Sequence, residues 1–226
     1  MRRKRGTKPA MELLCRLAAD GVVVVHLAFI LFVFLGGLLL FRWPRLVWLL
    51  CLATSWTSLA IAITLLDQVL AGGPISYVMG GWAAPWGIEY RIDAVNAYVI
   101  LIVTGIASVV MPYANQSVAR EIRADRVPLF YALLMLCLTG LLGMTITGDA
   151  FNVFVFLEIS SLSMYGLISM GRDRRALTSA FQYLVMGTIG GTFILIGIGF
   201  LYVVTGTLNM ADLAVLLPEV TQLRTL

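Results

Sequence analysis

The fold is decided by the stretch Thr147-Gly148-Asp149-Ala150-Phe151-Asn152-Val153-Phe154-Val155-Phe156-Leu157-Glu158. A Gly-Asp pair interrupts the chain there, and an apolar run follows from Phe151 to Met170. A helix needs about 20 apolar residues to cross about 30 Å of hydrocarbon, so this run predicts a membrane-spanning helix. Asp149 is placed to cap its first turn. The span contains a lone acid, Glu158, roughly 10 Å below the start of the helix.

The composition of the whole chain agrees with a membrane protein. Of its 226 residues, 60% are hydrophobic and only 12% are charged, against about 25% charged residues in soluble domains. Backbone groups in lipid must be hydrogen-bonded within their own segment, so the long apolar runs predict helices, and they are too long for barrel strands. We therefore predict an all-α, polytopic membrane helix bundle with about six spans. They are Val22–Phe41, Leu46–Ala71, Ala94–Tyr113, Pro128–Ile146, Phe151–Met170 and Ala176–Val204.

The segments between the spans divide the chain further. Residues 1–19 form a basic tail, residues 20–71 the first two spans, residues 72–93 an extracytoplasmic loop, residues 94–206 helices three to six, and residues 207–226 a short helix with a polar end. The tail precedes an apolar run as in a signal peptide. However, the run is long and lacks a small-residue cleavage site, which predicts a retained span. Within the loop, Ile75–Met79 and Gly87–Ile92 alternate in polarity and predict a small hairpin.

Arginine counts predict the orientation. The loops after the first, third and fifth spans hold eight arginines, whereas the loops after the second and fourth hold only Arg91. The eight are Arg42, Arg45, Arg120, Arg123, Arg126, Arg172, Arg174 and Arg175. This asymmetry puts the arginine-rich loops in the cytoplasm and the N-terminus outside. The basic tail, Arg2 to Lys8, favours the opposite orientation, so the two signals conflict at the first segment.

Several function classes have no support. The basic residues sit in short clusters between apolar spans, which is typical of topology signals and not of nucleic-acid binding. Cys15, Cys51 and Cys137 have no CxxC or Cys/His neighbour, so we expect no disulfide framework and no metal site. No HExxH, GxSxG, Walker or dinucleotide motif occurs, and we expect no cofactor.

Glu158 is the main candidate for chemistry. An ionisable group near the bilayer centre costs at least about 2.5–3.5 kcal/mol and indicates function by default. Helical spacing places Ser161 and Tyr165 on its face, where their hydroxyls can orient the carboxyl or hold a water. Asp149 and Asn152 at the entrance to the same span are capping residues first and channel-mouth groups second. The alternative is a protonated glutamic acid that joins helices by hydrogen bonding.

Other polar residues in or near the spans favour simpler roles. His26, with Asp20 six residues earlier, titrates near neutral pH, but a single interfacial histidine is more often a packing residue. Asp67 lies close to the end of its span, within reach of headgroups. Glycines at small-residue spacing in the last span predict close helix packing and no chemistry. They are Gly187, Gly190, Gly191, Gly197 and Gly199.

Several stretches together resemble the D-type subunit of the Mrp-type monovalent cation/proton antiporters. They are GGWAAPWGI (80–88), RIDA (91–94), TGDAFNVFVFLE (147–158), YGL (165–167), LY (201–202) and TGTLNMADL (205–213). The resemblance covers roughly Ala71 to Leu217 and rests on the ordered spacing of the pieces. The same family includes antiporter-like subunits of respiratory complex I, the NADH-quinone oxidoreductase, and of membrane-bound hydrogenases. It implies a bundle of about fourteen helices with two inverted repeats.

The resemblance also implies a role for Glu158. By position it is the family's fifth-helix glutamate, which pairs with a lysine on the seventh helix and moves protons or cations by changing charge state. On that pattern the lysine helix follows Leu226, and we expect this chain to be an N-terminal portion of the subunit, from a truncated or split gene. The front of the chain, from Asp20 to Leu46, instead resembles a small uncharacterised family of bacterial membrane proteins. That second resemblance predicts a fusion.

These resemblances predict a transport subunit of a multisubunit cation/proton antiporter and no enzyme. Its expected partners are other membrane subunits, the lipid bilayer, protons and, as one option, Na+, in the inner (plasma) membrane of a bacterium. One alternative is the equivalent proton-pumping subunit of an NADH-quinone oxidoreductase or a membrane-bound hydrogenase. A second alternative is a non-transporting scaffold or gene remnant.

Overall fold

The computed structural model describes residues 43–220. Within them, five helices are long and apolar enough to cross a membrane. The five are α2 (Pro44–Gly72), α3 (Ala94–Glu121), α4 (Val127–Ile146), α5 (Ala150–Ser169) and α6 (Arg174–Thr205). They confirm spans two to six of the prediction. The first predicted span, Val22–Phe41, lies outside the described residues, as do the basic tail, Cys15, Asp20 and His26.

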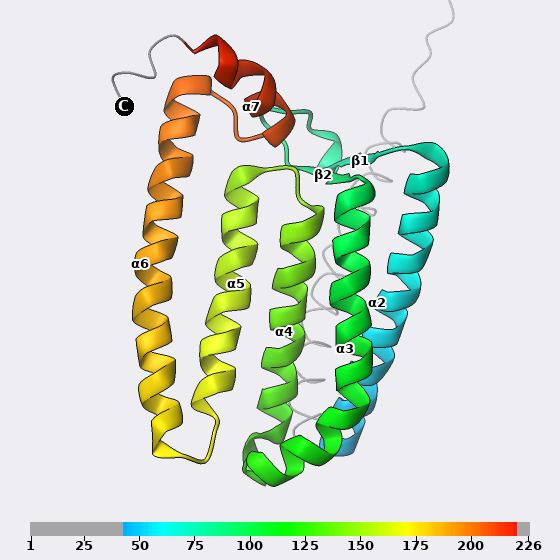
Figure 1. Cartoon of the computed structure of the whole chain (residues 1–226), viewed down its shortest axis with the longest axis vertical. Coiled ribbons are helices and arrows are strands. Elements are labelled where there is room, and N and C mark those ends of the chain that lie inside the picture. Colours follow the sequence, from blue (N-terminus) through cyan, green and yellow to red (C-terminus); the bar gives the residue numbers. More distant parts are fainter. Residues whose placement is uncertain (1–42, 221–226) are drawn as a thin grey trace, which may run out of the picture. The chain divides into compact units, whose positions relative to one another are not determined.

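The chain divides into two compact units, residues 1–46 and 47–226. Only the beginning of α2 is described in the first unit. In the second unit the helices stand side by side, and α3 to α6 each pack on the next helix in the sequence (Figure 1). This order follows from the short connections, since a turn of a few residues leaves the next helix antiparallel beside its predecessor.

Helix α3 is longer than the prediction, which was wrong to end the span at Tyr113. The helix continues through Pro112 to Glu121, and its last turns bend aside at one end of the bundle (Figure 1). The residues after Tyr113 are too polar to signal a membrane span, yet the helix continues through them to Glu121. Pro112 removes one helical N–H. Beside it, the indole Nε1 of Trp48 on α2 donates to the Met111 carbonyl at 3.0 Å.

Helices α4 and α5 approach closely because α4 presents glycines to α5. A Cβ added at Gly140 would lie 2.7 Å from the Ser160 Cβ and 2.8 Å from the Phe156 carbonyl oxygen, and one at Gly143 would overlap the Phe156 ring. Membrane helices associate through such small-residue contacts, since lipid tails are as apolar as the side chains.

Replacing Gly140 with valine will therefore destabilise the bundle. The new side chain meets backbone atoms of α5 that cannot move independently, and overpacking of this kind costs about 1–3 kcal/mol. Thermal unfolding in detergent measures the loss. The matched control is Gly105→Val on α3, where an added Cβ has nothing within 4 Å among residues 43–220. Equal melting temperatures for the two variants would contradict this account of the α4–α5 contact.

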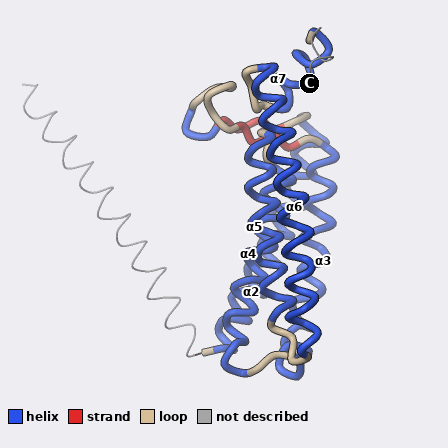
Figure 2. Tube along the Cα trace, turned by 90° about the vertical axis from the view of Figure 1, so that its left-hand side faces the viewer, coloured by secondary structure: helices blue, strands red, loops and turns tan. Residues whose placement is uncertain are grey.

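A two-stranded hairpin and a short helix cover one end of the bundle, where Figure 2 shows the strands. Strand β1 (Ile75–Val78) pairs antiparallel with β2 (Glu89–Ile92), with Ile75 opposite Ile92, which confirms the predicted hairpin. The chain leaves α6 through Gly206, whose φ of 73° favours glycine. Helix α7 (Met210–Leu216) follows. The Asn209 carboxamide caps it by accepting from the Ala211 and Asp212 N–H groups. The expected short helix is thus confirmed with a start at Met210.

Candidate functional site

Glu158 lies near the middle of α5, about 12 Å along the axis from the start of the helix at Ala150. Its side chain is partly buried. Among residues 43–220, no hydrogen bond or ion pair reaches its carboxylate, and the single ion pair joins Arg123 to Asp125 at one end of the bundle. The acid is thus deep within a span and has no counter-charge in the described part of the chain.

Helix α6 forms a slot for the Glu158 carboxylate. A Cβ added at Gly191 would overlap its Oε1 atom, and the Phe154 ring lies 3.6 Å from the same point. Gly191 is buried in the bundle. One glycine of the predicted stripe therefore makes room for the candidate acid. Sequence spacing alone pointed to packing at this glycine and did not connect it with Glu158.

Tyr165, one of the predicted supporting residues, occupies a second slot of the same kind. Its hydroxyl lies where a Cβ at Gly187 would be, and its ring meets that of Tyr183 edge-on at 5.2 Å. Gly187 and Gly191 are one helical turn apart on α6, whereas the residues they meet on α5, Tyr165 and Glu158, are about two turns apart. The predicted face of α5 thus packs on α6 along polar side chains and glycines.

The other predicted glycines of α6, and the predicted supporting residue Ser161, make no such contact between α5 and α6. Among residues 43–220, added Cβ atoms at Gly190, Gly197 and Gly199 meet nothing within 4 Å, so close packing at these three glycines stays a prediction. They lie on faces of α6 that α5 does not cover. Ser161 is partly buried, and its hydroxyl makes no hydrogen bond to a described residue. It stays a candidate by its place on the helix only.

The entrance to α5 is built from a buried cap. The Asp149 carboxylate accepts from the Asn152 N–H at 2.8 Å, which confirms the predicted capping role. The Asn152 carboxamide in turn donates to the Thr147 hydroxyl at 3.1 Å. Asp149 is 8% exposed, and burial raises the pKa of its carboxyl while the Asn152 and Phe151 N–H groups oppose that rise. Asp149 and Asn152 therefore fix where α5 begins, and a channel-mouth role for them stays a prediction.

A polar junction joins this entrance to the hairpin and to α7. The backbone carbonyl of Glu89 accepts a hydrogen bond from the Gly148 N–H at 2.8 Å. The Gly148 carbonyl accepts one from the Met210 N–H, also at 2.8 Å. The Glu89 carboxylate accepts from the Ser76 hydroxyl and, at 2.7 Å, from the Asn209 carboxamide. Asn209 is 3% exposed. Glu89 and Asn209 are 120 residues apart, and no local pattern signals that they meet.

Acidification will loosen this junction. Hydrogen bonds from Ser76 and Asn209 hold the pKa of Glu89 below its usual value near 4.5, against an opposing effect of burial, and Arg91 lowers it slightly further. The folded state thus gains stability from the ionised group above the unfolded pKa and loses it as pH falls through the lower folded value. Hydrogen exchange at the α7 amides will therefore quicken below about pH 4.5. In Glu89→Gln this acid-dependent step disappears, and an unchanged step in that variant would contradict the assignment.

A depression of about 520 Å³ opens beside the junction, lined by Glu89, Arg91, Asp93, Asn96 and Asn209 among others. Glu158 does not line it. Among the described residues, no group of three or more His, Cys, Asp or Glu side chains is arranged to hold a metal ion. The candidate site is therefore the α5–α6 slot, and the junction positions the ends of these two helices.

Two separate parts of the sequence match known protein families. Residues 147–225 match the family described as NADH:quinone oxidoreductase/Mrp antiporter, transmembrane. Residues 147–225 form part of an antiporter-like membrane domain. The match begins at the α4–α5 turn and includes the whole α5–α6 slot. Residues 16–72 match a separate family of unknown function, DUF2784, which confirms that the front of the chain resembles a different group.

Individual relatives of this antiporter-like domain come from both branches of the family. The N-type subunit of NADH-quinone oxidoreductase from Desulforudis audaxviator is 47% identical over 161 residues, which are 70% of this chain and 31% of the relative. The D-type subunit of the Na(+)/H(+) antiporter from Bacillus subtilis is 33% identical over 184 residues, 80% of this chain and 37% of the relative. The chain thus spans about a third of the length of these curated relatives.

Solved structures match the antiporter-like domain and the helices before it. A chain of the Mrp complex from Dietzia sp. superposes with a TM-score of 0.68 at 26% identity, over 79% of this chain and 34% of that one. A chain of the membrane-bound sulfane sulfur reductase, an archaeal respiratory membrane complex, gives a TM-score of 0.69 at 30% identity over 82% of this chain and 39% of that one. The protein is therefore a multi-pass membrane protein with an antiporter-like helix arrangement.

Proposed function

We propose that this chain acts in a membrane subunit of a multisubunit cation/proton antiporter and that Glu158 is a proton-transfer group in its path. The observation that carries the proposal is the α5–α6 slot, in which a carboxylate lies about halfway along a membrane span against Gly191. Ionisable residues are rare within membrane spans because each costs about 2.5–3.5 kcal/mol there, and those present mark proton or ion pathways.

The surroundings of Glu158 favour proton transfer over a purely structural role. A glutamic acid that joins helices needs a hydrogen-bond partner on the facing helix, since an unpaired polar group in hydrocarbon is costly. Here the facing residue is a glycine, which has no side chain to offer. No other described residue donates to the carboxylate. The slot therefore leaves the carboxyl open to a water or to a mobile counter-charge.

We propose that the counter-charge is a lysine on another helix of the assembled fold, in keeping with the resemblance of 147–158 to the family's fifth helix. A cation that approaches stabilises the ionised carboxylate, and a cation that withdraws favours the protonated acid. Alternation between the two states gives one proton taken up and one released per cycle. In this scheme Tyr165 and Ser161 orient the carboxyl or a bound water, and Asp149 and Asn152 hold the helix that carries it.

The second candidate is the equivalent proton-translocating subunit of an NADH-quinone oxidoreductase. The 47% identity to the N-type subunit from Desulforudis audaxviator favours it. The role of Glu158 is the same in both complexes, because what differs is the driving reaction in other polypeptides. In either complex we place the protein in a bacterial inner membrane, with the arginine-rich ends of α3, α5 and α6 toward the cytoplasm.

Purification of a tagged chain from its native membrane tests the choice of complex. For an antiporter we expect other hydrophobic membrane subunits to co-purify, and everted vesicles to exchange Na+ for protons without a redox substrate. Co-purification of flavin and iron–sulfur subunits, with proton movement only during NADH oxidation, would replace the first candidate by the second. A chain that purifies alone from vesicles without exchange activity would overturn both and leave the scaffold alternative.

A further inference from the structure

We propose that the arginine-rich end of the bundle holds a binding site for the phosphodiester headgroup of an anionic phospholipid, in the depression between the α3–α4 and α5–α6 connections. This depression has a volume of about 490 Å³. The depression is lined by apolar side chains that include Phe130, Leu167 and Ile168, by two arginines and by two acids. The charged residues are Arg120, Arg172, Glu121 and Asp173. Apolar side chains beside a pair of guanidinium groups match a lipid, which joins an acyl chain to a phosphate.

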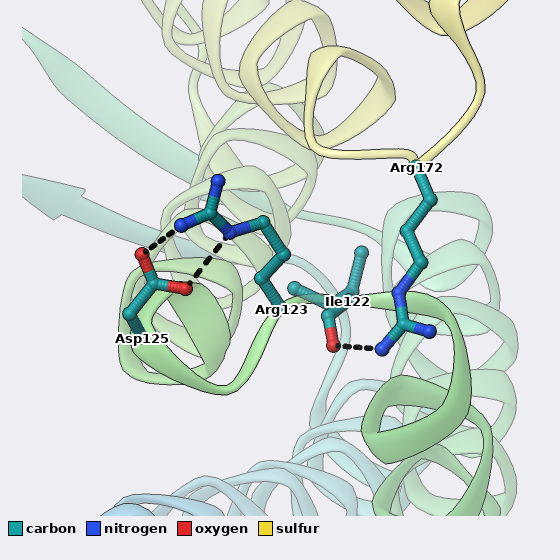
Figure 3. Close-up of polar contacts among 4 residues, drawn as sticks. All are labelled: Ile122, Arg123, Asp125 and Arg172. Carbon is teal, nitrogen blue, oxygen red and sulfur yellow. Dashed lines mark hydrogen bonds and ion pairs between the residues drawn. The ribbon is translucent and has the colours of Figure 1, made fainter.

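Arg172 is held at this depression by a contact between the two connections. One of its terminal nitrogens donates to the Ile122 carbonyl at 3.2 Å, as Figure 3 shows. Ile122 is the buried C-cap of α3, so the guanidinium lies at the negative end of that helix dipole. A guanidinium has five N–H donors. This single bond therefore leaves donors available for a phosphate.

The connections around the depression are net positive, although the lining itself holds two arginines and two acids. Residues 120–126 and 172–175 contain six arginines and three acids, a net charge of +3. Each acid is already engaged within the chain. Glu121 accepts from the Ser117 hydroxyl at 3.0 Å, Asp173 caps α6 by accepting from the Arg175 N–H at 3.0 Å, and Asp125 pairs with Arg123 at 3.1 Å. Figure 3 shows this last pair beside the Arg172 contact.

Arg120, by contrast, makes no side-chain hydrogen bond or ion pair with any residue from 43 to 220. It lies in the last turn of α3 and shares the depression with Arg172. Two permanently charged guanidinium groups in one depression suit a phosphodiester, since arginine binds phosphate oxygens in a fork. The net charge of +3 on the two connections disfavours the choline group of a zwitterionic lipid. This chemistry selects an anionic headgroup.

Native mass spectrometry of the detergent-purified complex tests the site, with phosphatidylglycerol and phosphatidylcholine of identical acyl chains as probes. We expect phosphatidylglycerol to bind at least about fivefold more tightly. We expect Arg120→Gln and Arg172→Gln each to weaken its binding about fivefold, the usual contribution of one basic residue at a membrane surface. Arg123→Gln is the matched control, because it removes the same charge from the same connection but lies outside the depression.

Four outcomes would overturn the proposal. Equal binding of the two lipids would remove the selection for negative charge. Equal weakening by Arg123→Gln and Arg120→Gln would show diffuse surface attraction in place of a site. A loss confined to Arg172→Gln would reflect only the broken contact to Ile122. Displacement of the lipid by soluble glycerol phosphate at a similar concentration would show that Phe130, Leu167 and Ile168 contribute nothing to binding.

Discussion

Glu158→Gln will abolish cation/proton exchange by the assembled complex and leave expression and helix content nearly unchanged. Glutamine keeps the size of the side chain and still fits against Gly191, but it neither takes up nor releases a proton. Loss of an essential proton-transfer group costs at least about 100-fold in rate. Sodium-dependent proton uptake in everted vesicles measures the effect.

Two variants serve as controls for Glu158→Gln. Asp67→Asn removes one negative charge from α2, where the side chain is exposed near the end of the helix, and we expect full exchange activity. Glu158→Asp keeps an ionisable carboxyl but shortens its reach, and we expect partial activity. Normal exchange by Glu158→Gln would contradict the assignment. Failure of Glu158→Gln to assemble would instead establish the structural role of a buried acid between helices.

Gly191→Ala will reduce exchange by about 10- to 100-fold, because misplacement of a reacting group by about 1 Å costs that much. The added methyl group overlaps the Glu158 carboxylate oxygen. The carboxylate is the far end of a flexible side chain, so it moves aside while the α5–α6 packing persists. We therefore expect the melting temperature of the complex to change little.

Gly190→Ala is the control for Gly191→Ala. It places the same methyl group one position earlier on α6, where nothing described lies within 4 Å, and we expect normal exchange. Equal activity of the two variants would show that the slot does not position Glu158. A large fall in melting temperature for Gly191→Ala would show that the helix contact, and not the carboxylate, depends on this glycine.

Local features of this fold are predictable from the sequence. Apolar runs predict α2 and α4 to α6 to within two residues at each end, because about 20 consecutive apolar residues have no other stable arrangement in lipid. The hairpin and the Asp149 cap are predictable as well, since each depends on neighbouring residues only. The end of α3 is not, because the polar turns after Pro112 carry no apolar signal.

The candidate site is only half predictable. Lipid makes a mid-span acid expensive, and this alone singles out Glu158. Its relation to Gly191 depends on the relative rotation of α5 and α6, which no single-helix pattern contains. The junction between Glu89 and Asn209 likewise depends on the hairpin and α7 meeting over one end of the bundle. Contacts between distant segments require the packed structure.

The central claim, that the Glu158 carboxyl changes protonation state during transport, is tested most directly by infrared difference spectroscopy of the assembled complex. The account predicts a carbonyl-stretch band of a protonated carboxyl that appears or disappears when a cation gradient is applied, and that is missing in Glu158→Gln. A complex that transports while showing the same band in wild type and in Glu158→Gln would contradict it.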